Sequence, residues 1–229
     1  MSITDKRKIT GWESITVGEY KEIVSLAKEY DGRNDDITFK VVVLSNLYGV
    51  KEDEIWDLGL DKAGSLMETI SFMVTPPQSP SRKTDKVRLG DRVYTVASNL
   101  NNFTYAQYVD FQNYYREEEN LTDVLSVLLI PEGMKYGRDY DLEDVKKDID
   151  ENLPITTALS ITGFFLNSLF SSIRHTLQYL ERKTKTMKSL PMKKTEREKE
   201  AIRKAMRQIS QLQHMVGFPS SKPSATSPE

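Results

Sequence analysis

Residues 153–173 form an unbroken run of 21 residues without a charged side chain. A run of this length can cross a bilayer as a helix, or it can form a helix that protein covers. It contains Pro154, Asn167 and seven serines and threonines, whose polar groups weaken insertion into lipid. We therefore expect a long helix over residues 153–180 that packs against polypeptide, with a membrane span as the less favoured alternative.

Two other segments predict helix starts because each has the spacing of a capping box. They read Thr16-Val-Gly-Glu19 and Thr104-Tyr-Ala-Gln107, and apolar residues at helical spacing follow both. In such a box the threonine hydroxyl accepts a hydrogen bond from the third helical N–H. The side chain of the Glu or Gln three residues later accepts a hydrogen bond from the threonine backbone N–H. We expect one helix to begin after each threonine.

The similarity between these two regions continues downstream. The shared features are an apolar run at residues 39–47 and 121–130, an aromatic-Asp-Leu triplet at 56–58 and 140–142, and a helix N-cap at Asp61 and Asp141. Chance similarity between helical segments is the alternative, but the joint recurrence favours a duplicated unit of three helices.

A proline-rich linker and a hairpin separate the two regions. Three prolines at residues 76–80 favour an extended chain. Apolar and polar residues then alternate over residues 86–96 on both sides of Gly90-Asp91, which is typical of a β-hairpin with a two-residue turn. An isolated hairpin is marginal in water, so we expect it to lean on the helices or to pair with another strand.

The predicted fold is mainly α, a helical bundle of two related helical halves with one small β-hairpin and a C-terminal amphipathic helix. The expected segments are a helical unit over residues 1–75, the linker and hairpin over 76–96, a second helical unit with the long apolar helix over 97–180, a basic amphipathic helix over 181–216 and a disordered tail over 217–229.

Charge is unevenly distributed although the net charge is only −2. Residues 110–151 carry 13 acidic and five basic side chains, whereas residues 181–207 carry 11 basic and four acidic ones. The basic segment could contact nucleic acid or an anionic membrane, but it lacks the interleaved aromatic residues of single-strand binders. Pairing of acidic with basic side chains, within one chain or between chains, agrees better with the near-zero total.

Composition excludes several kinds of chemistry. The chain has no cysteine and two histidines, so disulfides, thiol catalysis and cysteine-ligated zinc are ruled out. No phosphate-binding glycine loop or nucleophile motif occurs. The carboxylates of residues 139–144 could hold calcium or magnesium, but capping of a helix is the favoured interpretation. We expect no enzyme, no cofactor and no metal site.

Five segments together resemble a group of small helical proteins of tailed bacteriophages, the tail assembly chaperones and related virion-assembly proteins. They read ITVGEYKEIVSL, YGVKEDEIWDLGL, VRLGDRVYTV and FTYAQYVDFQNY with LTDVLSVLLIPEG, and the resemblance covers residues 9–180. It implies a non-enzymatic protein-binding factor. Such a factor would act in the host cytoplasm during assembly or stay in the virion.

We therefore predict a phage assembly factor that binds virion or tail proteins through apolar helical faces. A structural virion component, such as a connector or ring subunit, and a peripheral membrane-associated protein are the alternatives. Self-association stays open, and neither nucleic acid nor a membrane is an expected partner. The predicted partner-binding side chains are Ile161, Phe164, Phe165, Leu169, Ile173, Leu177, Ile202, Met206 and Ile209.

Overall fold

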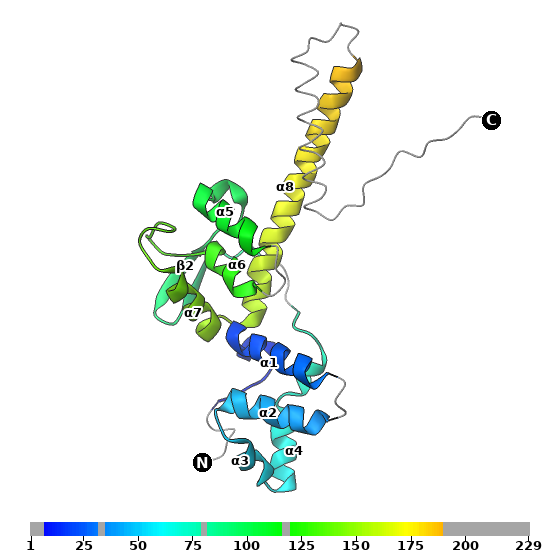
Figure 1. Ribbon diagram of the computed structural model, residues 1–229, viewed down its shortest axis with the longest axis vertical. Coiled ribbons are helices and arrows are strands. Elements are labelled where there is room, and N and C mark those ends of the chain that lie inside the picture. Colours follow the sequence, from blue (N-terminus) through cyan, green and yellow to red (C-terminus); the bar gives the residue numbers. More distant parts are fainter. Residues whose placement is uncertain (1–6, 32–34, 79–81, 116–119, 190–229) are drawn as a thin grey trace, which may run out of the picture. The chain divides into compact units, whose positions relative to one another are not determined.

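The computed structural model describes residues 7–31, 35–78, 82–115 and 120–189 (Figure 1). In these ranges the chain is mainly helical and has one three-stranded antiparallel sheet, so the predicted fold class is confirmed. The chain divides into two compact units, Met1–Phe165 and Leu166–Glu229, and the boundary falls within helix α8. Helix α8 continues to Ser189 instead of ending at residue 180, so residues 181–189 of the predicted basic helix are part of α8. The rest of that predicted helix and the predicted tail lie outside the described residues.

The N-terminal half consists of short helices up to the proline-rich linker. They are η2 (Trp12–Ser14), α1 (Val17–Tyr30), α2 (Asp36–Tyr48), α3 (Glu52–Trp56), α4 (Leu60–Glu68) and η3 (Ser71–Val74). The second half contains the sheet and the longest helix. Its elements are β1 (Lys86–Leu89), β2 (Arg92–Val96), η4 (Leu100–Asn102), α5 (Tyr105–Tyr114), α6 (Leu121–Leu128), β3 (Leu129–Pro131), α7 (Leu142–Asn152) and α8 (Ile155–Ser189).

Both predicted capping boxes are confirmed. At the start of α1 the Thr16 hydroxyl accepts from the Glu19 N–H at 3.3 Å, and the Glu19 carboxylate accepts from the Thr16 N–H at 2.9 Å. The Thr104 and Gln107 pair at the start of α5 repeats the arrangement at the same two distances. These bonds satisfy N–H groups that a helix start otherwise leaves without partners.

The two predicted N-caps have different outcomes. The Asp141 carboxylate caps α7 by accepting from the Glu143 N–H at 3.0 Å, which confirms that prediction. The prediction for Asp61 is wrong, because α4 begins at Leu60 and its N-cap is Gly59. Asp61 still lies in the first turn, where a negative charge interacts favourably with the helix dipole.

The second apolar run, residues 121–130, is not one helix as the duplication predicts. Helix α6 ends at Leu128, and the next three residues form strand β3, which pairs with β2. The predicted hairpin is confirmed, with Gly90 in its turn at a φ of 54°. Strand β3 is therefore the further strand that the hairpin needed, and the helical duplication stays a prediction for the other elements.

The sheet buries one face only. On this face lie Leu89, Tyr94, Val96, Leu129 and Pro131, and all of them are buried. The side chains of Lys86, Arg88 and Thr95 point to the opposite face and are exposed. This alternation is what a sheet with one face toward a core requires.

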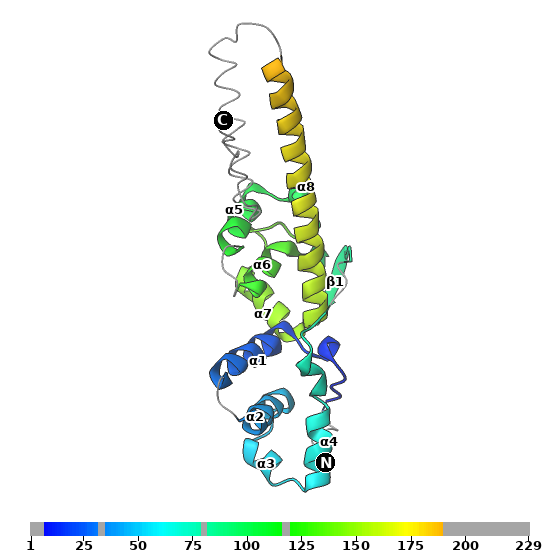
Figure 2. The same cartoon turned by 90° about the vertical axis from the view of Figure 1, so that its right-hand side faces the viewer.

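A short backbone bridge joins the start of α1 to the start of α8. The Val17 N–H donates to the Leu153 carbonyl at 2.9 Å, and the Ile155 N–H donates to the Ile15 carbonyl at 2.8 Å. Because residues 153 and 154 are extended here, α8 begins two residues later than predicted. Helix α1 also lies against α7 in both views (Figures 1 and 2).

Gly18 allows this close approach of α1 to α7. A Cβ atom at Gly18 would lie 2.8 Å from the Asp150 backbone oxygen, whereas a Cβ at Gly64 in α4 would meet no atom within 4 Å.

We expect Gly18→Ala to lower the free energy of unfolding by about 1–3 kcal/mol through overpacking. The control Gly64→Ala should raise it by roughly 0.5–1 kcal/mol, since alanine favours a helix interior. Urea denaturation measures both, and equal effects of the two variants would contradict the proposed contact.

Candidate functional site

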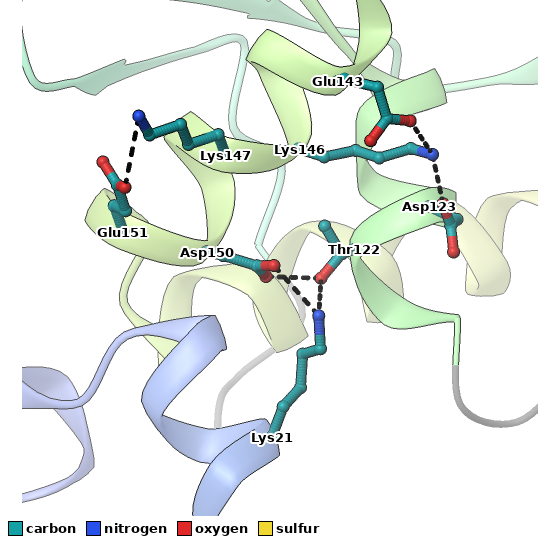
Figure 3. A pocket seen from close by; sticks show the side chains of 8 residues that line it. All are labelled: Lys21, Thr122, Asp123, Glu143, Lys146, Lys147, Asp150 and Glu151. Carbon is teal, nitrogen blue, oxygen red and sulfur yellow. Dashed lines mark hydrogen bonds and ion pairs between the residues drawn. The ribbon is translucent and has the colours of Figure 1, made fainter. Parts of the chain in front are cut away.

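Helices α1, α6 and α7 surround an open hollow of about 500 Å³ that is lined almost entirely by charged side chains (Figure 3). The lining residues are Lys21, Thr122, Asp123, Glu143, Lys146, Lys147, Asp150 and Glu151. Helix α7 supplies five of them because its apolar side chains Val145 and Ile149 face the core and its charged residues lie on the other sides.

One carboxylate in the hollow connects all three helices. Asp150 on α7 accepts from the Lys21 ammonium at 3.0 Å and from the Thr122 hydroxyl at 2.6 Å. The Lys21 Nζ also lies 3.2 Å from the Thr122 Oγ1, so the three side chains form a closed triangle, as Figure 3 shows. Each polar group therefore has a partner from another helix.

Lys146 forms the second group of contacts in the hollow. Its ammonium lies 2.7 Å from an oxygen of Asp123 and 2.7 Å from an oxygen of Glu143. It also lies 5.5 Å from the centre of the Tyr114 ring. Burial lowers the pKa of Lys146, but the hydrogen bonds to Asp123 and Glu143 outweigh burial, so the pKa is raised. Lys146 is held as a cation between α6 and α7.

The polar groups of the hollow are paired with one another across the three helices. A hydroxyl that donates to a carboxylate can mark a nucleophile and its base, as Thr122 and Asp150 do. Here the Lys21 ammonium binds the same carboxylate at 3.0 Å, so Asp150 is already paired with a cation. Among the described residues, no group of three or more acidic or histidine side chains is placed to hold a metal.

Other carboxylates of the predicted acidic segment also have partners within the chain. The Asp110 carboxylate accepts from the Tyr136 hydroxyl at 2.8 Å. Asp148 accepts from the Tyr94 hydroxyl and lies 3.4 Å from the Arg92 guanidinium. Burial and the Asp148 hydrogen bond raise the pKa of Tyr94 to about 12. The sequence count of acidic residues could not reveal these pairs, because the partners come from distant segments.

The predicted partner-binding residues lie in several different environments. Phe165 is 1% exposed and stacks on Phe103 at 5.4 Å between ring centres, with Phe111 edge-on at 5.1 Å. Ile161 is buried too, so the prediction that Ile161 and Phe165 offer an apolar surface to a partner is wrong. Leu169 is buried and Phe164 is half-buried. The structure does not describe the side chains of the other predicted residues, which are Ile173, Leu177, Ile202, Met206 and Ile209.

An exposed apolar surface occurs instead on α5. Tyr105 is 83% exposed, and Tyr108 and Val109 are also exposed. Their i, i+3 and i+4 spacing places them on one side of the helix, opposite the buried Gln107 and Phe111. We call these three residues the α5 surface. The sequence does not single out this surface, because tyrosines at helical spacing occur on core-facing and on exposed sides of a helix alike.

The comparisons with known proteins returned no match: no family model, no curated protein and no solved structure is similar to this chain. In the part of the chain that the structure describes, no helix has the length and hydropathy needed to span a membrane.

Loss of the Lys146 ammonium should destabilise the fold. Lys146→Met keeps most of the aliphatic stem and leaves Asp123 and Glu143 without their cation. We expect the free energy of unfolding to fall by about 1–2 kcal/mol. Lys147→Met is the matched control, because Lys147 lies 3.8 Å from Glu151 in an exposed pair, and its effect should stay within about 0.5 kcal/mol. Equal losses in urea denaturation would contradict the role of Lys146.

Tyr140 gives a second test of the side-chain contacts. Among the described residues its buried hydroxyl has no hydrogen-bond partner, and burial raises the pKa of Tyr140 to about 12. Tyr140→Phe should not lower stability at pH 7, whereas Tyr136→Phe should cost about 1 kcal/mol by removing the bond to Asp110. The folded state keeps the Tyr140 proton above pH 10. The free energy of unfolding should therefore fall as pH rises from 10 to 12, and it should fall less in Tyr140→Phe. Urea denaturation at pH 7 and pH 11 checks both expectations, and an equal loss in both variants at pH 7 would contradict them.

Proposed function

We propose that the protein is a non-enzymatic assembly factor of a tailed bacteriophage that binds another virion or tail protein, in the manner of a tail assembly chaperone. The resemblance of residues 9–180 to that group supports this proposal. The factor would act in the host cytoplasm during assembly.

The observation that carries the proposal is the α5 surface. Tyrosine is enriched among the residues that dominate binding energy at protein interfaces, because it buries a large area and loses little conformational entropy. Tyr105 exposes 83% of its surface in this chain, although its helix is held firmly by its other side. A partner that covers the α5 surface would remove this apolar area from water.

The packing behind α5 also favours a role in binding. Phe111 on the inner side of α5 contacts Phe103, Tyr115 and Phe165, with ring centres 5.1–6.0 Å apart. The Gln107 amide donates to the Val127 carbonyl of α6 at 3.2 Å, which fixes the helix further. A surface that is rigid before binding loses less entropy when a partner docks.

The charged hollow supports a binding protein more than an enzyme. Its lysines and carboxylates form ion pairs with one another at 2.7–3.8 Å. A catalytic acid or base must be able to exchange a proton with a substrate, and groups locked in ion pairs are poorly suited to that task. In our proposal the hollow holds α1, α6 and α7 together beside the binding surface.

A tagged chain, expressed from the phage genome that encodes it, tests the proposal during infection. Affinity capture and mass spectrometry should recover one virion or tail protein in a fixed ratio, and purified particles should lack the tagged chain. The double variant Tyr105→Ser/Tyr108→Ser should reduce capture at least about tenfold, since two interface tyrosines together contribute more than 1.4 kcal/mol. Trp56→Ser/Leu60→Ser is the control, because it alters exposed apolar residues elsewhere.

The outcomes separate the candidate functions. Presence of the chain in particles at fixed stoichiometry would replace the chaperone proposal with a structural virion component. Flotation of the purified chain with anionic vesicles, together with no captured virion protein, would replace it with a peripheral membrane protein. Equal loss of capture in both double variants would overturn the role of the α5 surface.

A further inference from the structure

The outer edge of β1 has backbone groups that face away from the sheet. The Val96 N–H donates to the Asp85 carbonyl at 2.9 Å, and Val87 lies opposite Tyr94 in the antiparallel register. Hydrogen bonding alternates along such a pair, so Asp85, Val87 and Leu89 bond to β2. The N–H and C=O groups of Lys86 and Arg88 therefore point outward, and no described strand pairs with them (β1 in Figure 2).

The side chains along this edge are basic on one face and apolar on the other. Lys86 and Arg88 are exposed on the solvent face of the sheet. Lys86 forms an ion pair with Glu132, while the Arg88 guanidinium has no ion pair in the described part of the chain. Val87 faces the core side but is only half-buried, so the edge of the apolar layer is still open there.

A second copy of the chain is a poor occupant of this edge. Two β1 strands that pair in antiparallel fashion would place Lys86 of one copy beside Arg88 of the other. Like charges on directly opposed residues destabilise a strand pair, and lysines on edge strands are a common means of preventing self-association. The same basic side chains would attract carboxylates on an incoming strand of another protein.

We propose that the outer edge of β1 binds an extended acidic segment of a partner protein as a fourth strand. The backbone of the segment pairs with Lys86 and Arg88, and its carboxylates lie beside their side chains. Its alternate residues are apolar and cover Val87. The segment therefore alternates acidic and apolar residues, because successive side chains on a strand point to opposite faces.

This inference rests on the proposed function only in that the partner is a protein, because the β1 edge is a different surface from the α5 surface.

Binding of a short fluorescent peptide in which glutamate and valine alternate tests the inference on the full chain. Fluorescence anisotropy should give a Kd on the order of 100 µM that weakens with added salt. A peptide with lysine in place of glutamate should not bind.

Charge exchange identifies the side chain involved. Arg88→Glu should weaken binding of the acidic peptide about fivefold and should allow the lysine peptide to bind. Lys40→Glu on α2 makes the same change of charge at an exposed position and should alter the Kd less than about twofold. Circular dichroism of each variant checks that the fold is retained.

Backbone pairing is tested with an acidic peptide that is N-methylated on the amides of one edge. Loss of binding by this peptide supports strand addition. Retained binding would overturn strand addition in favour of simple charge attraction, and absence of binding by the unmodified peptide would overturn the inference altogether. Tyr105→Ser/Tyr108→Ser should leave peptide binding unchanged, so failure of the β1 edge and failure of the α5 surface can be told apart.

Discussion

The backbone bridge between the start of α1 and the junction of α7 with α8 holds the first unit together. Ile15 and Val17 exchange hydrogen bonds with Leu153 and Ile155, although these segments lie at opposite ends of the unit in sequence. The missing side chain at Gly18 permits the contact, and Lys21 extends it into the charged hollow through Asp150. The Lys21–Asp150 pair of the hollow depends on this bridge, because Lys21 lies on α1 and Asp150 lies on α7, and the bridge brings these two helices together.

The aromatic cluster explains how a helix can be fixed on one side and exposed on the other. Phe165 fills the space behind α5 and contacts Phe103 and Phe111, so apolar burial is satisfied on the inner side alone. Tyr105 and Tyr108 lie on the other side of the helix and are exposed. Neighbouring apolar side chains that together form an exposed patch are typical of surfaces that bind another protein.

Several charged side chains of the first unit pair with one another between elements. The acidic residues of α7 and its neighbours contact Lys21, Arg92 and Lys146, which lie on different elements of the same unit. This arrangement agrees with the prediction that acidic and basic side chains pair, but the described partners lie outside the predicted basic segment. Arg88 on β1 is exposed and has no ion pair among the described residues, so its charge is available at the edge of the sheet.

The sequence by itself determined the features that depend on neighbouring residues. The capping boxes at Thr16 and Thr104, the Asp141 cap and the turn at Gly90 each need only residues within a few positions. Tertiary structure decided the rest: whether residues 129–131 form a strand, whether Phe165 faces a core or a partner, and which lysine meets Asp150. These outcomes depend on contacts between segments far apart in the chain, and a local pattern of apolar and charged residues is the same for each possible contact.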